Sequence, residues 1–270
     1  MTAVSEFTQS IHLPTMPEVA HELIQSLNDE DVPLAAVRNA IAKDPALTVK
    51  LIRLANSARY GVSREISSVD DAMMVVGMAQ VRTLALASCL SDAFPVVEGL
   101  ESHAFWQESQ TCAGYAQWLA TCVGSDPQQA WLTGFMVRLG ELVIVEKAPD
   151  ALSKIECTPH FPGARWQRES AVLGFTEGQI TAEMARQWNF PPAISDALET
   201  SADPMERRPF CRLGGVLHLA ELLCELQAEG HADDLKELPQ ELLSALQIER
   251  EWLIDHLPQA RKFASAAVLH

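Results

Sequence analysis

The chain has 270 residues, of which 48% are hydrophobic and only 6% aromatic, a composition that excludes a disordered chain and favours helices over a β-sandwich. Its 36 acidic residues outnumber its 20 basic residues, which gives a net charge of −16. Because nucleic acids and anionic membranes attract proteins mainly through Lys and Arg, we expect neither nucleic acid nor membrane as a partner.

The N-terminus and the cysteines indicate a cytoplasmic protein. The first ten residues, MTAVSEFTQS, have no basic start and no apolar run, so no signal peptide is expected. The most apolar stretch, residues 72–90, is interrupted by Gln80 and Arg82 and falls short of the ~20 apolar residues of a membrane span. No two of the six cysteines have CxxC spacing, which favours buried, reduced thiols over zinc ligands.

Helix start signals recur through the first eighty residues. Pro17 and Pro33 stand near the starts of two segments with helical apolar periodicity. Asp44 can cap a third helix, with Pro45 in its first turn. Ser68 begins a capping box ahead of a strongly apolar helix.

The second half of the chain offers no convincing strand. The best candidate, LVIV, ends the stretch LTGFMVRLGELVIV of residues 132–145, but it continues a helical pattern that begins at Leu132. No Asn-Gly or Asp-Gly hairpin turn separates alternating segments. The sequence therefore predicts an all-α fold, with one helix through residues 132–145.

A break in helical periodicity divides the chain into two helical lobes within one integrated domain. Pro95 and Gly99 interrupt the pattern, so we assign residues 1–97 to an N-terminal lobe and residues 98–270 to a second lobe. The tail, residues 241–267, has amphipathic character and is expected to cap the second lobe.

Three stretches of the first lobe together resemble the HDOD domain family, helical signalling domains of bacteria that are related to HD-type metal phosphohydrolases. They are LPTMPEVAHELIQSLND, AKDPALTVKLIRLANSARYG and ISSVDDAMMVVGMAQVRTLAL, and they follow the family's order and spacing. The resemblance continues more thinly, for example in AFWQESQTCAGYAQWLA and AWLTGFMVRLGELVI. It implies a compact helical lobe followed by an HD-like helical bundle.

The resemblance also places the former metal site of HD-type proteins at five positions, none of which keeps the expected residue. Histidine ligands are replaced by Glu108, Val137 and Glu177, and aspartate ligands by Arg138 and Glu221. Valine cannot bind a metal ion, and the guanidinium group of arginine stays protonated and repels one. We therefore expect no catalytic residue, no metal ligand and no cofactor at this degenerate site.

Two alternatives remain open for the degenerate site. Oxygen ligands suit magnesium or calcium, so Glu108, Glu177 and Glu221 could hold a hard cation. In the simpler alternative, Arg138 pairs with one or more of these glutamates and fills the vacated pocket. No HExxH, P-loop, GxSxG or GxGxxG motif offers another site, and His218 is expected to be a hydrogen-bonded core residue.

A locally basic stretch of the first lobe is a candidate interaction patch. It comprises Lys50, Arg53, Asn56, Arg59, Tyr60 and Arg64. On so acidic a protein it could dock an acidic partner or bind an anionic messenger such as a cyclic dinucleotide, although no motif supports the latter. The structural alternative is that Asn56 and its neighbours end a helix.

The lost ligands and the resemblance together favour a non-catalytic regulatory module of bacterial signal transduction. It would act through protein–protein contacts with signalling partners that the sequence does not identify. The enzymatic rival is a divergent HD-type phosphohydrolase with a carboxylate-rich metal site. The third hypothesis is an anion sensor at the candidate interaction patch.

Overall fold

The computed structural model describes residues 3–9, 13–29, 32–57, 62, 65–94, 100–156, 161–228, 235 and 238–266. Within these residues helices alternate with turns and no strand occurs, so the predicted all-α fold is confirmed. The helices are α1 (Ala3–Gln9), α2 (Glu18–Gln25), α3 (Leu34–Ala42), α4 (Pro45–Ala55), α5 (Val69–Val76), α6 (Met78–Ala93), α7 (Ser102–Cys122), α8 (Pro127–Met136), α9 (Leu139–Lys147), α10 (Pro149–Ile155), α11 (Ala164–Leu173), α12 (Glu177–Gln187), α13 (Pro192–Thr200), α14 (Arg212–Ala228), α15 (Gln240–Leu246) and α16 (Arg250–Ala266).

The predicted capping residues begin their helices. The side chain of Asp44 accepts hydrogen bonds from the backbone N–H groups of Ala46 at 2.9 Å and Leu47 at 3.0 Å. Ser68 Oγ accepts from the backbone N–H of Asp71 at 3.1 Å at the start of α5. These bonds satisfy N–H groups that have no partner inside the helix, so the sequence locates both helix starts correctly.

Two apolar segments that read as continuous helices are broken. Gly77, with φ of +92°, separates α5 from α6, and the two helices meet at a bend of 116°. The single helix predicted for residues 132–145 is also wrong, because a turn at Val137 and Arg138 divides it into α8 and α9. Hydrophobic periodicity missed this turn because the segments on both sides of it are buried.

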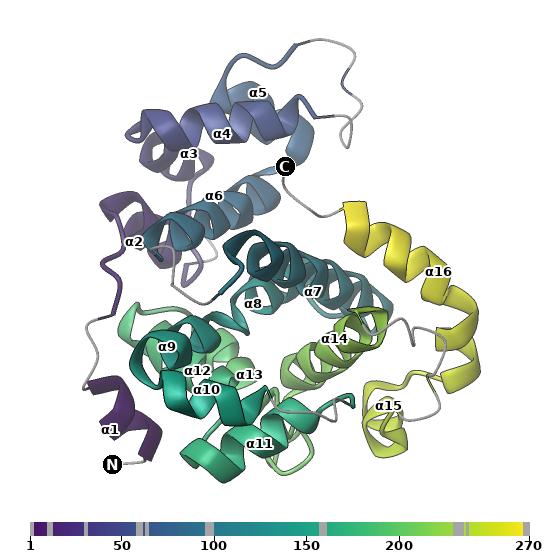
Figure 1. The fold of residues 1–270 in the computed structure, drawn as a ribbon. Helices are drawn as coiled ribbons and strands as arrows, with labels where there is room; N and C mark the ends of the chain where they lie inside the picture. The colour runs from purple at the N-terminus through teal and green to yellow at the C-terminus, as the bar shows by residue number, and fades with distance from the viewer. Residues whose placement is uncertain are drawn as a thin grey trace.

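The helices form a smaller group, α2 to α6, stacked on a larger bundle that contains α7 to α14 (Figure 1). A single cluster of buried hydrophobic side chains runs through both groups, from Met16 to Ala264. Helix α1 lies against α12, where the ring centroids of Phe7 and Phe175 are 5.1 Å apart. The lobe boundary at residue 97 stays a prediction, while the first helix packs with the second lobe.

The C-terminal helices cover one side of the bundle, as the sequence predicts for the tail. Helix α16 packs on α7, where the rings of Trp118 and Trp252 stack with centroids 5.6 Å apart. The two backbones approach so closely that a Cβ atom added at Gly114 would lie 2.6 Å from Cα of Ala264. Helix α16 is therefore an integral part of the packed core.

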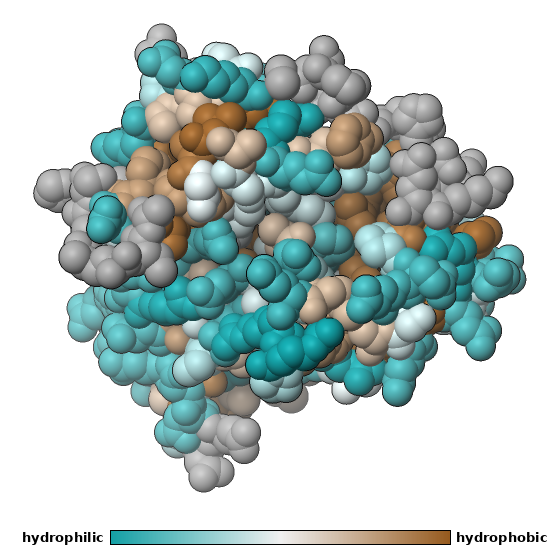
Figure 2. Space-filling model, turned by 90° about the horizontal axis from the view of Figure 1, so that it is seen from below, coloured by the Kyte–Doolittle hydropathy of each residue, from teal (hydrophilic) through white to brown (hydrophobic). Residues whose placement is uncertain are grey.

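The surface is mainly polar at the end of the molecule seen in Figure 2, with apolar residues gathered toward its upper part. Among the described residues, no single helix combines the length and the apolar composition of a membrane span. The pair α5 and α6 reaches that length and composition only when both helices are counted across their bend.

A close helix contact in the bundle predicts a sensitive position. A Cβ atom at Gly140 in α9 would lie 2.1 Å from the backbone oxygen of Glu177 in α12. Because backbone cannot move aside as a side chain does, we expect Gly140→Ala to lower the free energy of unfolding by about 3 kcal/mol. Urea denaturation measures this loss, and Gln107→Ala, on the exposed side of α7, is the matched control. A loss no larger than that of the control would contradict the close packing.

Candidate functional site

The turn between α8 and α9 sends its two residues in different directions. Val137 is fully buried in the core, and its carbonyl oxygen accepts a hydrogen bond from Thr181 Oγ1 at 3.1 Å. Arg138 instead extends into a cavity, with 22% of its side chain exposed. Of these two positions of the degenerate site, only Arg138 therefore faces the cavity.

Arg138 forms two ion pairs. Its Nη1 atom donates to Oε2 of Glu108 in α7, and its Nη2 atom donates to Oε2 of Glu141 at 2.7 Å. The predicted pairing of Arg138 with a glutamate of the degenerate site therefore occurs with Glu108. No ion pair joins Arg138 to Glu177 or Glu221.

A second arginine, Arg165 in the first turn of α11, lies among four glutamate side chains. Its Nε atom lies 3.0 Å from Glu169 Oε1 and 3.4 Å from Glu177 Oε2. Its Nη2 atom lies 3.7 Å from Glu141 Oε1, and Nη1 donates to Glu156. Glu169 in turn accepts the backbone N–H of Glu177 at 2.9 Å, which fixes the start of α12. Arg165 therefore connects four carboxylates around one guanidinium group.

The sequence did not single out Arg165, Glu141 or Glu169. A weak signal exists, because Arg138 and Glu141 are three residues apart and Arg165 and Glu169 are four apart, the spacings at which helical side chains meet. Such pairs are common on solvent-exposed helix faces, so spacing alone does not mark them as buried. The contact of Arg165 with Glu177 joins two different helices and leaves no local pattern.

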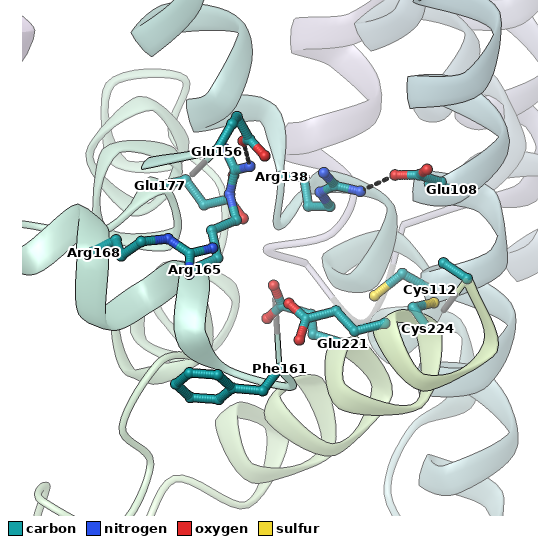
Figure 3. A pocket seen from close by; sticks show the side chains of 12 residues that line it. Glu108, Cys112, Arg138, Glu156, Phe161, Arg165, Arg168, Glu177, Glu221 and Cys224 are labelled. Carbon is teal, nitrogen blue, oxygen red and sulfur yellow. Dashed lines mark hydrogen bonds and ion pairs between the residues drawn. The ribbon is translucent and has the colours of Figure 1, made fainter. Parts of the chain in front are cut away.

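Arg138, Arg165 and several of the glutamates line a cavity of about 360 Å³ between α7, α11 and α14 (Figure 3). Four of the five predicted positions of the degenerate site therefore come together, and Val137 does not reach the cavity. The lining residues are Glu108, Cys112, Arg138, Glu156, Phe161, Arg165, Arg168, Glu177, Glu221, Cys224, Glu225 and Ala228.

Burial shifts the pKa values of carboxyl and thiol groups in and around the cavity. It raises the pKa of both Glu177 and Glu221 well above the ordinary value of a glutamate. Burial acts on Glu141 in the same direction, but Arg138 and Arg165 outweigh it and lower the pKa of Glu141. A hydrogen bond with Cys224, together with burial, raises the pKa of the Cys112 thiol. The Cys112 thiol is thus a poor candidate for a nucleophile, which must act as a thiolate.

The residues present do not fit the metal of an HD-type site. Such a site needs imidazole and carboxylate ligands that converge on one or two cations. The described part of the chain places no histidine in the cavity wall, and two guanidinium groups pair with the carboxylates of the cavity. Among the described residues, no group of three or more His, Cys, Asp or Glu side chains is arranged to hold a metal ion.

A comparison with known families identifies the family of this chain. The family model of the HDOD domain matches residues 13–204, which is most of the chain. The chain belongs to the HDOD domain family. The matched residues include the whole smaller helical group, α2 to α6, and the bundle helices from α7 to α13.

Solved structures share the fold of this HDOD protein. One from Shewanella amazonensis, named "Putative phosphohydrolase", is 27% identical, with a TM-score of 0.79, and the match covers 99% of this chain and 98% of the other. One from Marinobacter aquaeolei, named "Putative signal transduction protein", is 22% identical, with a TM-score of 0.80, and the match covers 98% of this chain and 62% of the other.

A curated relative from Treponema pallidum, named "Uncharacterized protein", is 24% identical over 191 residues. The match covers 69% of this chain but only 37% of that protein. This HDOD chain therefore spans well under half the length of the curated relative.

The candidate interaction patch is only partly described. Lys50 pairs with Asp92 at 2.6 Å, and Arg53 is exposed. Asn56 has an internal role, since its Nδ2 atom donates to the carbonyl oxygen of Ile66 at 2.7 Å and its Oδ1 atom accepts from Ile66 N–H at 2.8 Å. The other members of the patch, Arg59, Tyr60 and Arg64, lie outside the described residues.

His218 is hydrogen-bonded, as the sequence predicts, but it is only partly buried and lies outside the core. Its Nδ1 atom lies 2.7 Å from the carbonyl oxygen of Ser201, and its ring lies 4.4 Å from that of Trp166. Burial lowers its pKa, so the imidazole is neutral near pH 7. It does not line the cavity.

Replacement of Arg165 tests the ion-pair network. Arg165→Met keeps much of the side-chain volume but leaves buried carboxylates without their cation, so we expect a loss of about 3–5 kcal/mol in the free energy of unfolding. Arg186→Met is the matched control. The side chain of Arg186 is 38% exposed, so its replacement should lower the free energy of unfolding by no more than about 1 kcal/mol. Chemical denaturation compares the two, and equal losses would contradict a buried network.

The raised pKa of Glu221 predicts a pH effect with a definite sign. An unfolded glutamate releases its proton near pH 4.3, whereas burial holds the proton on Glu221 in the folded state. The stability that this proton contributes is present at low pH and is lost as pH rises through the folded pKa. Glutamine cannot ionise, so Glu221→Gln should gain stability relative to the wild type as pH rises from about 5 to 8.

Urea midpoints at several pH values measure this difference. Glu249→Gln, at an exposed position, should keep a constant difference from the wild type over the same range. A constant difference for Glu221→Gln as well would contradict the raised pKa.

Proposed function

We propose that this HDOD protein is a non-catalytic regulatory module of signal transduction that works by binding. The observation that carries the proposal is the sharing of Glu141 by two guanidinium groups. Its carboxylate lies 2.7 Å from Nη2 of Arg138 and 3.7 Å from Nη2 of Arg165. The cation at the centre of the former HD site is thus supplied by arginine.

Fixed arginines cannot perform the chemistry of a catalytic metal ion. A metal ion lowers the pKa of a bound water molecule and so generates the nucleophile for phosphate hydrolysis. An arginine can stabilise a phosphate but supplies neither the water nor a vacant coordination position. Two guanidinium charges also oppose the entry of a divalent cation at the same place. The cavity thus retains a binding shape without the means to activate water.

The enzymatic rival needs Glu108, Glu177 and Glu221 to be available as ligands of a hard cation. Glu108 is engaged by Arg138, and Glu177 lies 3.4 Å from Arg165. Only Glu221 remains without an ion pair, and one carboxylate is too few for a magnesium or calcium site. The name of the Shewanella amazonensis protein keeps the hydrolase hypothesis worth testing.

The anion sensor is supported less well. Of the two described basic residues of the candidate interaction patch, Lys50 is paired with Asp92, and Arg53 forms no ion pair with a described residue. One exposed cation is a weak receptor for an anionic messenger. We propose instead that the partner is a signalling protein, in keeping with the name of the Marinobacter aquaeolei neighbour.

A metal and activity assay separates these hypotheses. We expect the purified protein to bind manganese and magnesium far below one equivalent, and to release no phosphate from nucleotides or cyclic dinucleotides above the buffer rate. Calorimetry and phosphate detection make the two measurements. Metal-dependent turnover that disappears in Glu177→Ala but persists in the exposed control Glu249→Ala would overturn the proposal.

A further inference from the structure

One carboxyl group of the cavity has no partner among the described residues. Glu221 lies in α14 and is 5% exposed, yet no hydrogen bond reaches its Oε1 atom and no ion pair involves its side chain. Its carboxyl group points into the cavity, between the arginines on one side and the two cysteines on the other (Figure 3). A buried carboxyl group without a partner costs free energy, so its position calls for a ligand.

The charges of the cavity indicate the sign of that ligand. Seven glutamates line the cavity or contact its arginines, whereas three arginines do so, namely Arg138, Arg165 and Arg168. Arg138 is paired with two of the carboxylates, and Arg165 with four. Because these guanidinium charges are already paired, a cation beside Glu221 would meet little opposing charge, and it would stabilise the carboxylate form of Glu221 against the protonated form that burial favours.

From this we infer that the cavity binds a small organic cation, whose primary ammonium or guanidinium group pairs with the carboxylate of Glu221. The inference rests on the proposed non-catalytic role, since a ligand of this kind occupies the space that a metal centre would need. An organic cation suits the site better than a metal ion because it needs only one carboxylate and a few hydrogen bonds, rather than a full coordination shell.

The walls of the cavity fit a short aliphatic chain behind the cationic group. The volume of about 360 Å³ accommodates a chain of several carbon atoms. Phe161 is 48% exposed and offers an aromatic face, and Cys112, Cys224 and Ala228 contribute largely apolar surface. Aromatic and apolar walls bind alkyl chains and also attract cations through the ring face.

The same cationic group occurs in free amines and in the lysine or arginine side chains of a protein partner. Both sources present an aliphatic stem and a terminal charge, and both fit the chemistry of Glu221. The test therefore has one arm with n-butylammonium and agmatine and another with a capped Gly-Lys-Gly peptide. Saturable binding in either arm, if it depends on Glu221, supports the inference and identifies the source.

Calorimetric titration of the full chain in EDTA tests the inference without any metal. We expect n-butylammonium or the lysine peptide to bind, and n-butanol and butyrate, which match the chain but lack the positive charge, not to bind. Glu221→Gln keeps the shape of the side chain but cannot ionise to pair with the bound cation, so the affinity should fall by about tenfold to a hundredfold. Glu249→Gln should bind as the wild type does.

A second variant tests the cavity independently, in case Glu221→Gln misfolds. Ala228 is exposed at the end of α14 and also lines the cavity, so Ala228→Trp should block the cavity and weaken binding without a change in the core. Absence of binding in both arms, or equal binding by the wild type and both variants, would overturn the inference. Metal-dependent hydrolysis would instead overturn the proposed function, so the two failures are distinguishable.

Discussion

The carboxylate of Glu141 lies between two largely buried guanidinium groups, and the arrangement of the surrounding helices depends on that contact. Arg138 reaches across from the α8–α9 turn to α7, and Arg165 joins α11 to the start of α12. Charges this deeply buried are tolerated only when each has a partner. The network therefore fixes the positions of four helices relative to one another, even where its net contribution to stability is small.

Much of the fold could be predicted because it depends on local signals. The caps at Asp44 and Ser68 act within three residues, and the amphipathic tail carries its own pattern of buried positions. The family resemblance likewise rests on contiguous stretches, and the matched range confirms it. The turn that interrupts residues 132–145 escaped prediction because buried residues continue through it without a polar interval.

The candidate site was predictable in part. The sequence predicts that Arg138 pairs with one or more of the three glutamates of the degenerate site, and Glu108 is the one it contacts. The sequence does not predict that Glu177 pairs with a different arginine. That arginine is Arg165, which belongs to another helix, α11. Sequence spacing reports neighbours on one helix, whereas this choice of partner is made between helices and depends on tertiary geometry. The isolation of Glu221 has the same origin, since the available cations are already engaged elsewhere.

The ion-pair network also bears on what a metal site in this cavity would require. If Arg138 were replaced by an acidic ligand, Glu108 and Glu141 would lose a cation, while Arg165 would remain in the place where a metal ion must bind. Each single change of this kind therefore lowers stability before a metal ion has its full set of ligands. A metal site in this cavity would need several substitutions together, because each one made alone leaves a buried charge without its partner.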